Sequence, residues 1–118
     1  CRAVLEGVAY TFRYGMEVME AGGVQFETIR AGNDNLFQAE AFTTTLAALS
    51  GKPVELYEVT GAVGAARACM VPGKGLEEVR RQTATRDYLS TVKPPPETES
   101  LLQGYLHWKH ELEKHLKP

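Results

Sequence analysis

The sequence predicts an α/β fold that contains at least one βαβ unit. Three observations lead to this prediction: a long amphipathic segment opens the chain, two short strand-like segments follow it, and a helical segment lies between those two. Strands joined through a helix pair in parallel, and such crossovers are almost always right-handed. We therefore expect residues 28–31 and residues 54–59 to form parallel neighbours, joined by a right-handed crossover through a helix.

The first expected helix carries one apolar stripe. Gly22 and Gly23 end this helix, because a left-handed C-cap favours a residue without a Cβ atom. The stripe recurs every three or four positions over about five turns, and its members are Val4, Val8, Phe12, Met16 and Met19.

The second expected helix joins the two strands. Turn residues 32–35 lead into it, and Gly51 and Pro53 close it. Its apolar positions are Leu36, Phe42, Leu46 and Leu49. In the strand that follows, Val54 and Leu56 alternate with Glu55 and Tyr57, a period typical of a strand with one buried face.

The rest of the chain is expected to be helical. Gly61 opens a helix of small residues that should bury Ala65, Ala66 and Cys69, and residues 76–82 form a short helix with Glu early and Arg late. Residues 72–75 read as a surface turn.

A stiff proline spacer at residues 93–96 divides the chain into a lobe, residues 1–92, and a tail, residues 93–118. The tail carries a last amphipathic helix with capping-box spacing from Ser100 to Gln103, and that helix needs a partner surface. Its apolar positions are Leu101, Tyr105, Trp108, Leu112 and Leu116.

Composition narrows the classes of partner. A net charge of -2 and a pI near 5.9 leave no basic footprint for nucleic acid or anionic lipid. No apolar run approaches the roughly 20 residues of a membrane span. Two cysteines, Cys1 and Cys69, are too few to staple a secreted scaffold, so a cytoplasmic location is expected. The chain opens without an initiator methionine, as a fragment of a longer protein would.

Two glycine turns are candidate binding elements. In open α/β sheets, ligands sit at the carboxyl ends of the strands. Residues 31–35 fall at such a place: Gly32 permits close approach of a phosphate or ribose, and the Asn35 carboxamide can donate and accept. From the residues alone, a plain left-handed turn with an asparagine cap is the favoured alternative. For Gly61 and Gly64, close packing of a helix on the sheet is favoured over phosphate binding.

No catalytic or metal-binding residues are predicted in this chain. Residues 72–75 contain the Gly-Lys pair of a phosphate-binding loop, but Gly75 replaces the Ser or Thr that would bind magnesium. His107 and His110 are expected to be solvated, and Arg80 and Arg81 read as the solvated end of a short helix.

Three motifs, in order, resemble the FGGY carbohydrate kinases, and most closely their xylulose-kinase-like branch. The Arg-Ala-Val-x-Glu-Gly pattern stands at residues 2–7, an Ile-Arg-Ala-Gly turn with Asn-Leu-Phe stands at 29–37, and a strand running into a small-residue helix covers 55–67. Together they span about the first 75 residues. The resemblance implies the C-terminal, ATP-binding part of a ribonuclease-H-like, actin-like ATPase domain.

The same resemblance implies which residues bind the nucleotide. It maps adenosine contacts onto Ala31, Gly32 and Asn35, with Asn33 and Phe37 beside them. The catalytic base, the sugar pocket and the residues that mainly hold Mg²⁺ are implied upstream, so the 118 residues alone should not turn over substrate. Asp34 departs from the family pattern, and a carboxylate beside a triphosphate costs affinity unless it is turned outward or bridged by magnesium.

Two functions therefore stay open. One is part of an ATP-dependent kinase for a ketopentose such as D-xylulose, or for another sugar or polyol. The other is a non-catalytic interaction or regulatory module with the helix of Trp108 as its contact surface. As part of a two-lobed enzyme, the chain should leave an apolar strip uncovered, and should self-associate or belong to a homodimeric parent.

Overall fold

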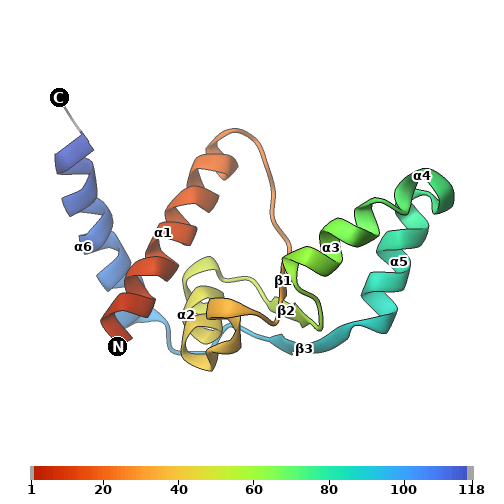
Figure 1. The fold of residues 1–118 in the computed structure, drawn as a ribbon. Coiled ribbons are helices and arrows are strands. Elements are labelled where there is room, and N and C mark those ends of the chain that lie inside the picture. The colour runs from red at the N-terminus through yellow and green to blue at the C-terminus, as the bar shows by residue number, and fades with distance from the viewer. Residues whose placement is uncertain (1, 117–118) are drawn as a thin grey trace.

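A computed structural model describes residues 2–116 of the chain, and Figure 1 shows its ribbon. Cys1 lies outside the described residues. The elements, in chain order, are α1 (Arg2–Ala21), β1 (Ile29–Gly32), the short 3-10 helix η1 (Asn35–Gln38), α2 (Glu40–Ser50), β2 (Val54–Tyr57), α3 (Gly61–Ala68), α4 (Val71–Lys74), α5 (Leu76–Arg86), β3 (Tyr88–Val92) and α6 (Glu99–Leu116).

The three strands form one sheet in the order β1-β2-β3. β1 and β2 are parallel, in a register that runs from the Ile29 and Val54 pair to the Gly32 and Tyr57 pair. The expected parallel pair is confirmed, with α2 lying between its strands in the chain. β3 pairs with β2 in the antiparallel sense, with an irregularity next to Tyr57. The sequence did not predict β3.

The core lies where α1, α2 and α6 meet the sheet. More of the buried side chains come from α2 than from any other element, because α2 lies between the other two helices and the strands. One buried cluster comprises Ala9, Tyr10, Phe42, Leu46, Leu49 and Tyr105, and a second comprises Ala47, Val54 and Leu56. Tyr57, which was expected on the open face of its strand, is also buried and packs edge-on against Tyr88 of β3.

The predicted helix ends are confirmed at the two glycine sites. At the end of α1, the N–H of Val24 donates to the Met19 carbonyl at 3.1 Å and that of Gly23 donates to Glu20 at 3.0 Å. This pair of bonds is a Schellman cap, and Gly23 adopts the left-handed φ of 96° that the cap requires. Gly51 closes α2 in the same left-handed region.

The last helix finds its partner surface on α1 and α2. Tyr105 is buried there, and its hydroxyl donates to a carboxylate oxygen of Glu17 at 2.8 Å. The Nζ atom of Lys109 donates to the same oxygen, also at 2.8 Å. Trp108 packs on the rings of Tyr10 and Tyr105. The helix begins at Glu99 rather than at the expected Ser100 cap.

The segment from α3 to α5 is an arm that stands away from the core (Figure 1). Residues 72–75, expected to be a surface turn, lie mostly in the single helical turn α4, and α5 continues four residues past the expected end to Arg86. Ala65, Ala66 and Cys69 are exposed, so the expectation of burial was wrong. Among residues 2–116, no other element covers the side of α3 that carries Ala65, Ala66 and Cys69, although the composition of α3 is that of a core helix.

The apolar stripe of α1 is only partly buried. Met16 is 7% exposed, but Val4 is 64%, Phe12 44% and Met19 46% exposed. Neighbouring Val18, at 59%, extends the uncovered area. We refer to Val4, Phe12, Val18 and Met19 as the α1 outer face.

The chain is also extended as a whole. Its radius of gyration is 16.3 Å, against about 13.5 Å for a compact domain of this length. The extended arm and the uncovered α1 outer face both reflect this shape.

Candidate functional site

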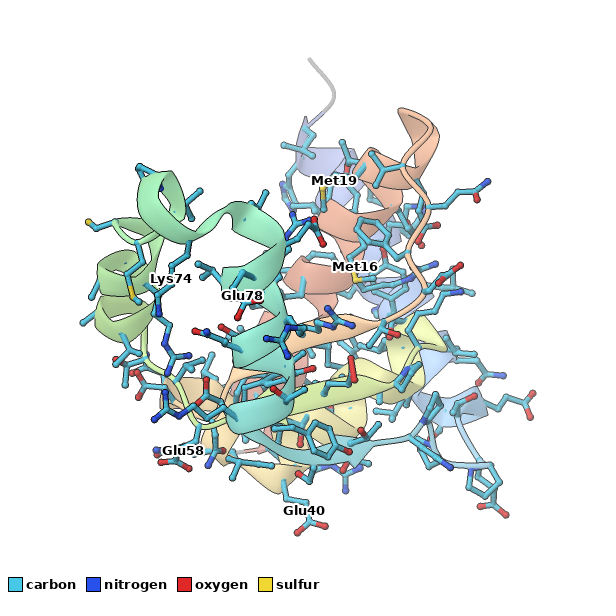
Figure 2. The ribbon with its side chains drawn as sticks, turned by 90° about the vertical axis from the view of Figure 1, so that its right-hand side faces the viewer. Met16, Met19, Glu40, Glu58, Lys74 and Glu78 are labelled. Atoms are coloured by element: carbon cyan, nitrogen blue, oxygen red, sulfur yellow. The ribbon has the colours of Figure 1, made fainter. Side chains whose placement is uncertain are left out.

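A cavity of about 570 Å³ lies between the sheet and the arm. The carboxyl ends of β1 and β2 form one side, and α3, α4 and α5 form the other. In Figure 2 the arm is marked by Lys74 and Glu78, to the left of α1 with Met16 and Met19. The lining residues are Arg30, Ala31, Gly32, Tyr57, Val59, Gly64, Arg67, Ala68, Val71, Leu76, Val79, Arg80, Thr83 and Ala84.

The cavity combines an apolar wall with guanidinium groups. Three of its lining residues, Arg30, Arg67 and Arg80, are arginines, and none of its lining residues carries a carboxylate. Apolar side chains of the arm and the turn after β2 make up most of the remaining wall. The volume falls within the range of small-molecule sites, about 300–1,000 Å³. A ligand with a flat apolar part and an anionic part fits this chemistry.

Each arginine is held by a carboxylate that lies outside the lining. Arg30 donates to Glu55 across the β1–β2 pair at 2.9 Å, and this hydrogen bond raises the pKa of Arg30. Arg80 pairs with an exposed Glu77 at 3.4 Å. Because a guanidinium has five N–H donors, these single contacts leave donors for a ligand.

Arg67 is the most firmly placed of the three. Its Nη1 atom donates to Asp87 and, at 3.4 Å, to the hydroxyl of Thr83. The carbonyl of Asp87 in turn accepts from the N–H of Glu58 at 2.7 Å, just after β2. Arg67 therefore ties α3 to the end of α5, and the carbonyl of Asp87 ties the end of α5 to the end of β2.

Tyr57 lines the cavity on the side of the sheet. Burial, and to a smaller extent the charge of Glu55, raises the pKa of its phenol. The phenol is therefore neutral at physiological pH and brings no negative charge to the site.

The five residues expected to contact adenosine divide into two groups. Ala31 and Gly32 line the cavity, whereas Asn33, Asn35 and Phe37 do not. Asn33 donates from its backbone to the Tyr57 carbonyl at 2.8 Å, which continues the strand pairing. Asn35 is exposed and adopts a left-handed φ of 51°.

Phe37 lies on the other side of β1. Its ring packs edge-on against Phe42 at a centroid distance of 5.2 Å. It also lines a second cavity, of about 520 Å³, together with Phe12 and Met16 of α1. Its contacts in this structure are those of a core residue.

The Asp34 carboxylate is turned to a local backbone contact. It accepts from the N–H of Asn35 at 2.8 Å and caps η1. Asp34 does not line the cavity.

The glycines of the two turns differ from the expectation in their packing. A Cβ atom on Gly32 would overlap the carbonyl oxygen of Val59, so this glycine is required by backbone packing. A Cβ atom on Gly61 or Gly64 would meet nothing within 4 Å, so close helix packing does not explain those two. Gly64 lines the cavity and Gly61 does not.

Sequence reasoning missed the arginines of the site. Arg80 was interpreted as the solvated end of a short helix, and its side chain is indeed 67% exposed, but it also borders the cavity; Arg67 carried no expected role. Both reach the cavity only because α5 folds back beside α3, and no local pattern signals that arrangement. The role of Tyr57 in lining the cavity was also missed. Its burial depends on a tertiary contact with β3, a strand that the sequence did not predict.

Residues 2–116 contain neither a metal-binding cluster nor a membrane-spanning helix. No group of three or more His, Cys, Asp or Glu side chains in this range is arranged to hold a metal ion. No helix in the same range combines the length and apolar character needed to cross a membrane.

Comparison with known proteins identifies one informative likeness in fold. No family profile matches the chain, and no curated protein sequence matches it. The crystal structure of xylulose kinase from Rhodospirillum rubrum is similar, with a TM-score of 0.71 at 23% sequence identity. The match covers 96% of this chain and 24% of that kinase chain, so this chain spans about a quarter of the kinase's length. The mixed α/β fold described here is thus similar to the fold of one part of that xylulose kinase.

Proposed function

We propose that this chain is the nucleotide-binding part of an ATP-dependent carbohydrate kinase of the FGGY family, with an actin-like ATPase fold. The substrate proposed for the whole protein is a ketopentose such as D-xylulose, and the proposed location is the cytoplasm. The observation that carries the proposal is the cavity with three arginines and no lining carboxylate at the carboxyl ends of β1 and β2. The fold shared with part of a xylulose kinase supports it.

In this proposal the cavity receives ATP or ADP. The apolar wall from α3 to α5 accommodates the base, with Arg67 beside it, and the free N–H donors of Arg80 contact anionic oxygens. Ala31 and Gly32 line the opposite side of the cavity, at the end of β1. We propose that Asn33 and Asn35, in the turn that follows, contact the part of the adenosine that extends past these lining residues. Phe37 supports the turn by packing beneath it.

Phosphoryl transfer needs more than this site supplies. The nucleotide must be held in line with a sugar hydroxyl, and a base must accept the hydroxyl proton. We propose that the base, the sugar pocket and most contacts to Mg²⁺ come from other parts of the protein, so the 118 residues alone should bind nucleotide without turning over sugar.

The test is an NMR titration of the full ¹⁵N-labelled chain with Mg²⁺ and ATP. Amide shifts are expected at Ala31, Gly32 and along α3, with little change at the far end of α6. Saturable shifts confined to α6, or none, would contradict the proposal.

Two neighbouring arginines provide a matched pair of variants. The side chains of Arg80 and Arg81 are both 67% exposed, and each pairs with a glutamate three residues earlier. Only Arg80 lines the cavity. Arg80→Gln should weaken ATP binding several-fold, because one charge-assisted contact is lost, while Arg81→Gln should leave it unchanged. Equal effects of the two variants would indicate nonspecific charge attraction.

A non-catalytic interaction module is a second candidate function. The α1 outer face favours it, because several exposed apolar side chains share one side of α1, and exposed apolar surface marks association sites. Failure of the chain to bind nucleotide, together with association through this face, would select this function over the first.

A further inference from the structure

Gly64 is a helix residue that the packing of this chain leaves unexplained. It lies in the interior of α3, where glycine is less favourable than alanine because of its backbone entropy. A Cβ atom at this position would meet no atom within 4 Å. Nothing among the described residues therefore requires the absence of a side chain there.

The space beside Gly64 belongs to the cavity. Gly64 lies on the α3 side of the cavity, with Arg67 and Ala68 on the same helix. Across the cavity stand Ala31 and Gly32 at the end of β1. The structure thus leaves an open, nearly side-chain-free stretch of helix next to a guanidinium that Asp87 and Thr83 hold in place.

We propose that Gly64 is a specificity-determining residue that lets the flat face of a purine base lie against α3. This inference rests on the proposed function. It adds that the α3 side of the cavity binds the base of the nucleotide. A planar base needs close approach to the backbone over an apolar surface, and a Cβ atom would take up that space. Arg67, three residues along the helix, then lies beside the bound base, where its planar guanidinium can stack or donate.

Gly61 provides a matched control for Gly64. Both glycines belong to α3, and a Cβ atom has open space at each. Only Gly64 lines the cavity. Alanine at either position therefore gains in helix propensity, and only alanine at Gly64 should interfere with a bound base.

The experiment measures binding of Mg²⁺–ATP and of tripolyphosphate to the full native chain, to Gly64→Ala and to Gly61→Ala, by calorimetry, with the melting temperature of each. Gly64→Ala should melt no lower than the native chain, yet bind ATP at least tenfold more weakly and tripolyphosphate with unchanged affinity. Gly61→Ala should match the native chain in both affinities. A gain or retention of stability with a selective loss of ATP affinity is a result that a merely structural role would not give.

Three outcomes would overturn the inference in different ways. Unchanged ATP binding by Gly64→Ala would overturn the role of Gly64 and leave the proposed function standing. An equal loss of ATP and tripolyphosphate affinity would assign this wall to the phosphates instead of the base. A native chain that binds tripolyphosphate and not ATP, or binds neither, would overturn the proposed nucleotide site together with the inference.

Discussion

At Gly104 the backbone of α6 comes close to the side chain of Tyr10. A Cβ atom there would stand 2.6 Å from the Tyr10 hydroxyl oxygen. The tyrosine ring packs on Tyr105 and Trp108, so it cannot move away without disturbing the core. This contact explains why a glycine occupies the interior of a helix, where alanine is normally favoured by about 1 kcal/mol.

The Gly104 contact predicts a background-dependent substitution. Gly104→Ala in the native chain should lower the free energy of unfolding by about 1–3 kcal/mol, the usual cost of overpacking. In Tyr10→Phe the next ring atom, Cζ, lies at 3.6 Å, an ordinary contact, so the same substitution should be neutral or stabilising. Urea denaturation of the four proteins measures the difference as a double-mutant cycle.

A control comes from Gly15, where a Cβ atom meets nothing within 4 Å in the interior of α1. Gly15→Ala should raise the free energy of unfolding by up to about 1 kcal/mol in either background. An identical cost for Gly104→Ala with and without the Tyr10 hydroxyl would show that the close contact is not the cause.

Substitution by alanine should change stability in opposite ways at Gly32 and at Gly64. Gly32→Ala should lower the free energy of unfolding by about 1–3 kcal/mol, because the added methyl group overlaps the backbone of Val59. Gly64→Ala is the control and should not destabilise. Thermal melts of both variants decide the matter. A stable Gly32→Ala would contradict the packing reason and restore a ligand-only reason for this glycine.

At the scale of elements, sequence patterns predicted the helices and strands that bury one face against the core. The parallel pair, α2 and the ends of α1 and α2 followed from apolar periodicity and from Gly23 and Gly51. β3 was missed because its first three residues, 88–90, are exposed and show no alternation. The burial of α3 was overestimated because small apolar residues usually indicate a covered helix, whereas here they face a cavity or solvent.

The candidate site was predicted only in part, for a related reason. Ala31 and Gly32 follow a strand directly, so the rule for strand ends located them. Arg67 and Arg80 become part of the cavity through the fold-back of α5 beside α3, which is a tertiary arrangement. Whether Asn33 and Asn35 contact a nucleotide stays a prediction.

The tie between α1 and α6 depends on Glu17. Glu17→Ala should lower the free energy of unfolding by about 1–3 kcal/mol, because the Tyr105 hydroxyl and Lys109 lose a shared charged acceptor. Glu20→Ala, which removes an exposed contact to Arg13, is the control and should cost less than about 1 kcal/mol. Fluorescence of Trp108, the single tryptophan, reports the docking of α6. Equal costs for the two variants would contradict this role of Glu17.

The same tie predicts a pH dependence. Partial burial by itself would raise the pKa of Glu17, but hydrogen bonds from Lys109 and Tyr105 outweigh it and lower the pKa below 4.5. A depressed carboxyl pKa adds stability that is fully present above the unfolded value and is lost as pH falls through the folded value. As the pH falls from 5 through the folded pKa of Glu17, the free energy of unfolding of the native chain should therefore decrease more than that of Glu17→Gln. Parallel pH curves for the two proteins would rule this out.

At the scale of the whole molecule, the buried core and the candidate site occupy different regions. The core lies among α1, α2 and α6, while the cavity lies between the sheet and the sparsely packed arm. The arm meets the core through the sheet and through the hydrogen bond from the N–H of Glu58, just after β2, to the carbonyl of Asp87. A ligand that fills the cavity should therefore stabilise the arm most, since it adds contacts where the chain has few.

The α1 outer face predicts self-association of the chain. Its members lie within about 120° of one helix at 100° per residue, and Val4 and Val18 are each more than half exposed. In light scattering, the native chain should show a mass that rises above the monomer with concentration, because association removes this apolar surface from water. The double variant Val4→Lys, Val18→Lys should stay monomeric with an unchanged melting temperature, since neither side chain is buried. Leu106→Lys, an equally exposed site on α6, is the control and should still associate. A native chain that is monomeric at every concentration and binds no apolar dye would show that this face is not a contact surface.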